Sequence, residues 1–275
     1  PDTLVVSISQ SGETMDTLMA VKYARERDAR TLSICNTQGA TIPRESDAIV
    51  YTHAGPEVAV ASTKAFVAQI TALYLLALHV ARVREALSPT EVAQHVLELE
   101  AIPEKIERTL KAEQGRIEQL AHWMADTRSV LFLGRNVGFP IALEGALKLK
   151  ELAYIHAEGF AAGELKHGPI ALIDDGQPVF VVMPSPLDRH SLHAKVVSNI
   201  QEVRARGART FAVAERGDAA VRGQAEVVFE VPETQPMLMP LLTTVPLQIF
   251  ALELATAKGY DVDQPRNLAK SVTVE

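Results

Sequence analysis

The fold is decided near the start of the chain by the stretch Leu4-Val-Val-Ser-Ile-Ser-Gln-Ser-Gly-Glu-Thr-Met-Asp16. Its first half is a short run of apolar, mostly β-branched residues, which is typical of a buried strand. Its second half places hydroxyl side chains around Gly12, and a helical pattern of apolar residues then runs from Leu18 to Ala24. The stretch therefore predicts a strand, a tight turn and the N-terminus of a helix.

This turn carries groups that could bind a small anion. Ser9, Ser11 and Thr14 have hydroxyl groups, Gly12 lets the backbone turn or approach a ligand, and the first helical N–H groups lack intrahelical partners. Because the turn has no Lys or Arg, it favours a phosphate ester held by hydroxyls, amides and the helix dipole. An ordinary Ser/Thr-capped helix is the alternative, and both interpretations stay open.

The length, composition and charge of the chain limit the classes of protein to which it can belong. The chain has 275 residues, which suits about two domains, and 47% of them are hydrophobic but only 5% aromatic. A core built mainly from Ala, Val, Leu and Ile suits buried parallel strands covered by helices. The formal net charge of −7 argues against nucleic acid or an anionic membrane as a partner.

The compartment follows from the cysteine count and from the apolar segments. The chain has a single cysteine, Cys35, so it cannot form an intrachain disulfide, which agrees with a reducing cytoplasm. Because Cys35 lies in an apparent strand, we expect it to have a packing role. Polar residues interrupt the longest apolar helix, 65–83, so we expect a core helix and not a membrane span.

The chain opens at Pro1 directly before a strand, and we treat it as a fragment of a longer polypeptide.

Further along, strands and helices alternate as in parallel α/β proteins. The expected strands are 30–35, 48–52, 129–134, 179–183, 210–214 and 227–231, and the expected helices are 65–84, two between 88 and 122, 141–155 and 187–206. Ser62 lies at the start of the 65–84 helix, where it could face the same ligand as the first turn or act as an N-cap. We expect a first domain over residues 1–112, a second over 113–262 and a tail over 263–275.

Three charged residues of the 141–155 helix share one face. Glu144, Lys148 and Glu151 follow each other at i, i+4 and i+7. The spacing is typical of a solvated salt-bridge ladder. A partly buried carboxylate beside an ammonium could instead move protons between adjacent carbons, so a catalytic role stays open.

Two more candidates follow. His167 precedes Gly168-Pro169 in a loop of small residues and is either a general acid/base or a plain surface histidine. Lys270 lies in the tail, where Pro265 and the apolar Leu268 favour docking over fraying. A docked, desolvated lysine could form a Schiff base with a sugar carbonyl.

Taken together, these motifs resemble the isomerase portion of the glutamine:fructose-6-phosphate aminotransferase (glucosamine-6-phosphate synthase) family over essentially the whole chain. The resemblance is carried by Ser9-Gln-Ser-Gly-Glu-Thr14, Val60-Ala-Ser-Thr-Lys-Ala-Phe66, the Glu144 to Glu151 helix, Gly163-Glu-Leu-Lys-His-Gly-Pro169 and the Asp263 to Glu275 tail. It implies two flavodoxin-like sugar isomerase (SIS) subdomains with parallel sheets, each a three-layer α/β/α arrangement, followed by a C-terminal tail.

The resemblance also implies a role for each candidate residue. The phosphate of fructose 6-phosphate would be held by Ser9, Gln10, Ser11 and Thr14, and the sugar would be lined by Val60 and Ser62. Catalysis would be carried out by Lys270 as the imine-forming amine, His167 in ring opening, Glu151 in proton transfer between C1 and C2, and Lys148 assisting it. No metal or other cofactor is expected.

The same resemblance implies partners. The histidine loop enters from a neighbouring subunit in the family, so a homodimer with shared sites is implied. The family's N-terminal glutaminase domain, and the first isomerase strand with its ligand-touching turn, would precede Pro1.

The leading hypothesis is therefore a cytoplasmic isomerase module that, in the intact enzyme, converts fructose 6-phosphate and ammonia to glucosamine 6-phosphate. A regulatory SIS module that binds a sugar phosphate without reacting would need Ser9 to Thr14 but not Glu151, His167 and Lys270. Another sugar isomerase or a deglycase of the same superfamily is the third alternative, against which the tail argues.

Overall fold

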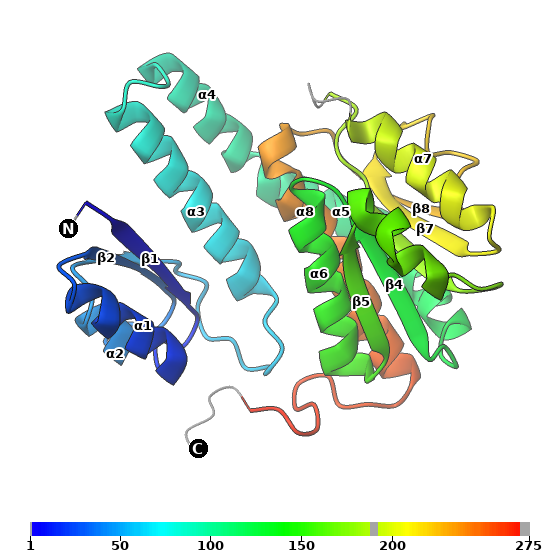
Figure 1. The fold of residues 1–275 in the computed structure, drawn as a ribbon, viewed down its shortest axis with the longest axis horizontal. Coiled ribbons are helices and arrows are strands. Elements are labelled where there is room, and N and C mark those ends of the chain that lie inside the picture. Colours follow the sequence, from blue (N-terminus) through cyan, green and yellow to red (C-terminus); the bar gives the residue numbers. More distant parts are fainter. Residues whose placement is uncertain (1, 188–191, 270–275) are drawn as a thin grey trace. The chain divides into compact units, whose positions relative to one another are not determined.

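The structure, a computed structural model, describes residues 2–187 and 192–269 (Figure 1). The chain divides into two compact units. The described part of unit 1 comprises residues 2–92 and 263–269, and that of unit 2 comprises residues 93–187 and 192–262. Lys270, the expected amine, lies outside the described residues.

Unit 1 is a parallel three-stranded sheet with helices. Its elements are β1 (Leu4–Ser9), α1 (Met15–Arg25), β2 (Arg30–Cys35), α2 (Thr41–Arg44), β3 (Ala48–Tyr51) and α3 (Lys64–Val83). The strand order is β1-β2-β3, and the registers pair Ser9 with Cys35 and Cys35 with Tyr51. All three strands therefore end at the same edge of the sheet, so the turns that follow them gather there.

Two segments of unit 1 are less buried than the sequence predicts. Leu4, Val6 and Ile8 of the edge strand β1 are exposed, whereas residues 31–35 of the central strand β2 are buried. Helix α3 was expected to be a core helix, yet only Ala65, Ala72 and Leu78 of its twenty residues are buried. Its length and apolar composition would also suit a membrane span, but Gln69, Thr71, His79 and Arg82 interrupt the apolar sequence.

Unit 2 is built on a parallel five-stranded sheet of order β5-β4-β6-β7-β8. Its strands are β4 (Ser129–Gly134), β5 (His156–Ala161), β6 (Pro178–Val182), β7 (Arg209–Glu215) and β8 (Val227–Val231). Its main helices are α5 (Ile102–Trp123), α6 (Gly138–Lys148), α7 (Leu192–Arg204) and α8 (Met239–Ala257), and α4 (Pro89–Glu100) contains the division between the units.

Both faces of this sheet are covered, because successive strand residues point to opposite sides. On one face Leu131, Val179 and their neighbours pack against Val196 and Ile200 of α7. On the other face Phe180 contacts the rings of Phe132, Phe211 and Phe250, with ring centroids 4.7 to 5.2 Å apart. Helix on sheet on helix is the three-layer α/β/α arrangement, and the predicted α/β fold class with parallel sheets is confirmed.

Two elements of unit 2 were not predicted. The expected 141–155 helix ends as an α-helix at Lys148, continues as the π-helical turn η1 (Leu149–Ala153) and stops at Tyr154, which has a φ of 54°. Strand β5 follows at once, where only a loop was expected. Helix α8 also went unpredicted, although twelve of its residues are buried.

The structural division falls earlier than the expected boundary near residue 113. It lies between Val92 and Ala93, within α4. The reason is that the whole of α5 packs against unit 2, mainly on α8 and on β8. In this structure residues 93–112 therefore belong to unit 2.

Truncating Phe180 to alanine should destabilise unit 2 by about 3–5 kcal/mol, because the ring is fully buried and contacts three other rings. The single tryptophan, Trp123, lies beside Phe211 in the same unit, so denaturant unfolding followed by tryptophan fluorescence measures the right transition. Leu97→Ala, at a side chain that is 65% exposed, is the control and should cost less than about 0.5 kcal/mol. Equal losses in the two variants would contradict the proposed core.

Candidate active site

The turn between β1 and α1 is held together by its own polar groups. The Ser9 hydroxyl accepts a hydrogen bond from the N–H of Gly12 (2.9 Å), and the Ser11 hydroxyl accepts one from the N–H of Glu13 (3.2 Å). Gly12 has a φ of +71°, and a Cβ atom there would lie 2.5 Å from the Cβ of Ala40. Only glycine fits this position, so the turn adopts one compact shape.

The cysteine below this turn has the expected packing role. Cys35 is fully buried, and its Sγ lies 2.9 Å from the place where a Gly12 side chain would begin. Burial raises the pKa of the Cys35 thiol, which keeps it protonated and unreactive near neutral pH.

Thr14 does not act as a capping side chain. It occupies the N-cap position of α1, but its hydroxyl makes no capping hydrogen bond and the residue is exposed. The first helical bond runs from the N–H of Leu18 to the carbonyl of Thr14 (3.0 Å). The backbone N–H groups in the first turn of α1, before Leu18, are therefore available to another acceptor. The alternative prediction, that this helix is capped by a Ser or Thr side chain, does not hold for Thr14.

A carboxylate occupies the start of α3. One oxygen of Glu57 accepts hydrogen bonds from the N–H groups of Thr63 (2.9 Å) and Ala65 (3.3 Å). The N-cap residue is Thr63, so Ser62 is not the cap that the sequence allowed. The Ser62 hydroxyl is buried and makes no hydrogen bond with the described part of the chain. The sequence did not reveal Glu57, because its spacing from the helix fits no common capping pattern.

The C-terminal tail begins beside the same loop. The N–H of Val60 donates a hydrogen bond to the carbonyl of Asp263 (3.1 Å), and both residues belong to unit 1. Pro265 is buried, whereas Leu268, an expected anchor, is 44% exposed. The hydrogen bond to Asp263 and the burial of Pro265 both contribute to docking this part of the tail.

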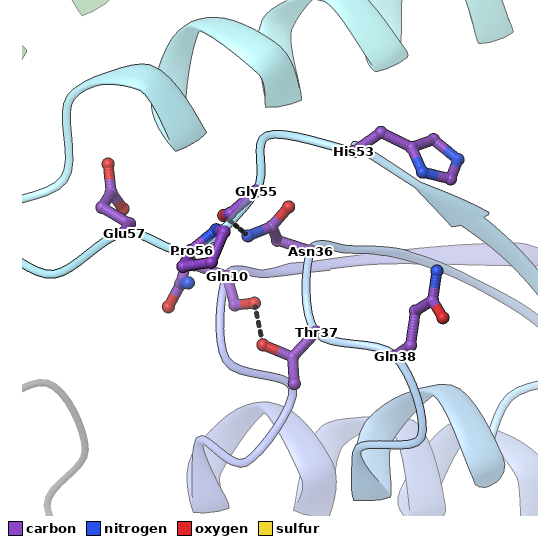
Figure 2. Close-up of a pocket in the computed structure, with 8 residues that line it drawn as sticks. All are labelled: Gln10, Asn36, Thr37, Gln38, His53, Gly55, Pro56 and Glu57. Atoms are coloured by element: carbon purple, nitrogen blue, oxygen red, sulfur yellow. Dashed lines mark hydrogen bonds between the residues drawn. The ribbon is translucent and has the colours of Figure 1, made fainter.

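A cavity of about 570 Å³ opens beyond the carboxyl ends of the unit 1 strands (Figure 2). Its lining includes Gln10, Asn36, Thr37, His53 and Glu57. Hydrogen bonds from Asn36 to the Gly55 carbonyl (2.9 Å) and from Thr37 to the Gln10 carbonyl hold the lining loops together. Among the predicted site residues that the structure describes in unit 1, only Gln10 belongs to the lining of this cavity.

In unit 2, α6 and η1 bring together three charged side chains. Lys148 Nζ lies 3.5 Å from Glu144 Oε1 and makes a short ion pair with Glu151 Oε2. The side chains of Lys148, Glu144 and Glu151 are only 3%, 9% and 22% exposed. The solvated salt-bridge ladder is therefore wrong, because these side chains are largely shielded from water.

Burial sets the electrostatics of this trio. Desolvation raises the pKa of Glu144, although the neighbouring Lys148 ammonium acts in the opposite direction. Lys148 is thus held between two carboxylates of different exposure. Glu151 is the more exposed one, and a partly accessible carboxylate beside a buried ammonium has the arrangement needed for proton transfer.

His167 lies at the end of a short 3₁₀ helix, η2 (Ala162–His167). The residue is exposed, and within the described chain its ring makes no hydrogen bond or ion pair. Gly168 follows with a φ of +146° and begins the next short helix, η3 (Pro169–Leu172). His167 is therefore presented outward on a well-defined backbone.

The predicted residues thus form two groups, one in each unit. Ser9, Gln10, Ser11 and Thr14 share one turn of unit 1, with Val60 and Ser62 on another loop of the same unit, and Lys148 and Glu151 share a helix end of unit 2. Among the described residues, no cluster of three or more His, Cys, Asp or Glu side chains could hold a metal ion.

Parallel sheets whose carboxyl ends carry polar turns define a class of α/β proteins that bind small ligands at those ends. The family comparison is more specific, since the SIS domain model matches residues 1–79 and 124–258. The chain therefore belongs to the SIS domain family.

Two curated relatives and one solved structure extend this result. The chain is 73% identical over 273 residues to a glutamine–fructose-6-phosphate aminotransferase [isomerizing] of Leifsonia xyli subsp. xyli, and 66% identical to that of Corynebacterium diphtheriae. Each match covers 99% of this chain but 44% of the relative. The C-terminal domain of glucosamine-fructose-6-phosphate aminotransferase from Francisella tularensis is similar, with 40% identity, a TM-score of 0.88, and coverage of 95% of this chain and 73% of that one.

Replacing Glu144 by glutamine should change how stability depends on pH. Because the folded-state pKa of Glu144 is raised above its usual value of 4.5, ionisation of this group weakens the fold as pH rises through the range above that value. Glu144→Gln does not titrate, so its stability relative to the wild type should increase between about pH 4.5 and pH 7. Urea unfolding followed by Trp123 fluorescence measures the difference.

Glu118→Gln, which removes an exposed carboxylate from α5 of the same unit, controls for the general loss of one charge. A Glu144→Gln profile parallel to that of the wild type at every pH would show that Glu144 ionises as freely in the fold as in the unfolded chain.

Proposed function

We propose that this chain is the isomerase module of a glutamine–fructose-6-phosphate aminotransferase, acting on fructose 6-phosphate and producing glucosamine 6-phosphate. The curated relatives carry that name, and the chain matches 44% of their length. The remainder of the intact enzyme would include the glutaminase domain that supplies ammonia. A soluble, cytoplasmic location suits a metabolic enzyme of this kind and the single buried cysteine.

The turn after β1 is the proposed phosphate site. The hydroxyl of Thr14, the side chains of Ser9, Gln10 and Ser11, and the N–H groups before Leu18 would hold the phosphate without a basic residue. Ser62 supports the adjoining sugar site, because its buried hydroxyl has no partner within the described chain and a sugar hydroxyl would provide one. Val60 precedes it on the same loop.

The chemistry would be divided among the remaining candidates. His167 would open the sugar ring, entering from a neighbouring subunit of a homodimer. The amine of Lys270 would attack C2 of the open ketose and release water, forming an imine, and ammonia would then replace the lysine nitrogen. Glu151, assisted by Lys148, would remove a proton from C1 and return it to C2, which leaves an amine on C2 and an aldehyde at C1.

One observation carries the enzymatic proposal, namely the burial of Lys148 between Glu144 and Glu151. A buried ammonium with two carboxylates is costly to build, and a module that only binds a sugar phosphate has no use for it. The hydrogen bond between Val60 and Asp263 gives further support, since it starts the tail beside the proposed sugar site and leads toward Lys270.

Borohydride reduction of the full chain with fructose 6-phosphate, followed by peptide mass mapping, should attach the sugar phosphate to Lys270. Borohydride converts the reversible imine to a stable secondary amine, so the modified peptide identifies the lysine. Lys270→Arg should remove the adduct. The matched control Lys258→Arg, which changes a lysine whose Nζ bonds the Ala125 carbonyl, should retain it. Tight binding of the sugar with no adduct on any lysine would instead favour the regulatory module.

Thr14→Ala should weaken fructose 6-phosphate binding by about 1.5–3 kcal/mol, as expected for the loss of a hydrogen bond to a charged group. Isothermal titration calorimetry measures the change. Thr71→Ala is the control, because the Thr71 hydroxyl bonds the Val67 carbonyl within α3, and its removal should leave the affinity unchanged. If Thr14→Ala binds as the wild type does, the phosphate is held elsewhere.

A further inference from the structure

A second polar cavity, of about 250 Å³, lies in unit 2 and contains none of the residues assigned above to the reaction. Three segments line it, each following a different strand. Arg135 follows β4, Gly163 and Lys166 belong to η2 after β5, and Lys195, Asn199 and Glu202 lie on α7 after β6. The cavity is therefore formed beyond the carboxyl ends of three neighbouring strands.

The lining carries an excess of positive charge. Lys166 pairs with Glu202 at 2.8 Å, which neutralises the one carboxylate of the lining. Arg135 and Lys195 make no ion pair with the described part of the chain. Two cations that line one small cavity repel each other, and an anion between them would relieve that repulsion.

The backbone around Arg135 is arranged to hold its guanidinium group. A Cβ atom on Gly163 would lie 3.1 Å from Arg135 Nη2, so the guanidinium rests directly against the η2 backbone. A Cβ atom at position 163 would require the guanidinium to shift by a few tenths of an ångström, so glycine leaves room for it there. The planar donor fork of an arginine suits two oxygens of one phosphate.

A buried polar atom in the lining also lacks a partner. Asn199 is 7% exposed, and its Oδ1 accepts no hydrogen bond from the described chain, while its Nδ2 donates to Glu202 at 3.3 Å. The ionised oxygens of a phosphate group are acceptors and cannot satisfy another acceptor. A ligand hydroxyl group would do so, and a buried acceptor left without a donor costs free energy.

The topology places the cavity where open parallel sheets bind ligands. From the neighbouring strands β4 and β6, the connections run in opposite directions, since β4 leads through α6 to β5 and β6 leads through α7 to β7. Figure 1 shows α6 and α7 on opposite faces of the sheet of unit 2. Such a reversal leaves a crevice at the carboxyl ends of the two strands, and ligands commonly occupy it.

We propose that this cavity, which we call the α7 pocket, is a second ligand site that takes a small phosphate monoester bearing a hydroxyl group. Arg135 and Lys195 bind the phosphate, and Asn199 Oδ1 accepts a hydrogen bond from the ligand hydroxyl. The proposal does not depend on the proposed function, because it uses no residue of the turn between β1 and α1.

The test uses the full chain carrying Ser11→Ala and Thr14→Ala, so that phosphate bound at the first turn does not contribute. Calorimetric titration of this background with inorganic phosphate, and separately with glycerol 3-phosphate, should give one saturable site. The glycerol ester should bind more tightly, because it brings hydroxyl groups. Lys195→Glu, at an exposed position, should raise the dissociation constant for both probes by about tenfold or more, as should Arg135→Ala.

Arg128→Ala is the matched control, since Arg128 is an exposed cation of the same unit at the opposite, amino-terminal end of β4. It should leave both affinities unchanged. The proposal is overturned if the background binds neither probe saturably, or if Arg128→Ala weakens binding as much as Lys195→Glu does. Equal affinities for the two probes would overturn the assignment of a hydroxylated ester.

Discussion

The burial of one ammonium group governs the architecture around α6. The Lys148 side chain is 3% exposed, and a charge so far from water must be paired or lose its proton. Glu144 lies one helical turn before Lys148 and Glu151 lies three residues after it, so both carboxylates reach the ammonium. The π-helical turn Leu149–Ala153 carries Glu151 against the same ammonium, and π turns of this kind are frequent at functional sites.

Two of the helix starts in unit 1 differ in whether a carboxylate of the protein already occupies them. At α3 the Glu57 carboxylate already accepts the N–H groups of Thr63 and Ala65, so that site is occupied by the protein itself. At α1 the nearby carboxylate of Glu13 turns away and accepts the N–H of Thr41 instead (2.9 Å). Its pKa is lowered by those Thr41 hydrogen bonds, so it stays charged without filling the helix start. An anion at α1 therefore competes with no carboxylate that caps this helix.

How much the sequence predicts depends on the kind of residue. Strands 30–35 and 227–231 were predicted at their observed bounds, because each is a short segment rich in apolar and β-branched residues. Strand β5 reads His-Ala-Glu-Gly-Phe-Ala and has no such residue, so only its pairing with β4 makes it a strand. Helix α8 is apolar on every side and contains Pro246, so no helical period marks it. Spacing likewise put Glu144 and Lys148 on one face, but only the fold shows that this face is buried.

On the proposed function, the start of the tail belongs to the same unit as the residues that contact the phosphate and the sugar. Residues 263–269 belong to unit 1, and the Asp263 carbonyl accepts a hydrogen bond from the N–H of Val60, on the loop proposed to line the sugar. Lys270 follows this segment in the sequence, so the proposed function would have the amine act on a substrate that the same unit holds. The proton-transfer group on unit 2 needs no contact with the phosphate. It needs only a carboxylate that pairs with a buried ammonium and remains partly accessible, and Glu151 has both features, since it pairs with Lys148 and its side chain is 22% exposed.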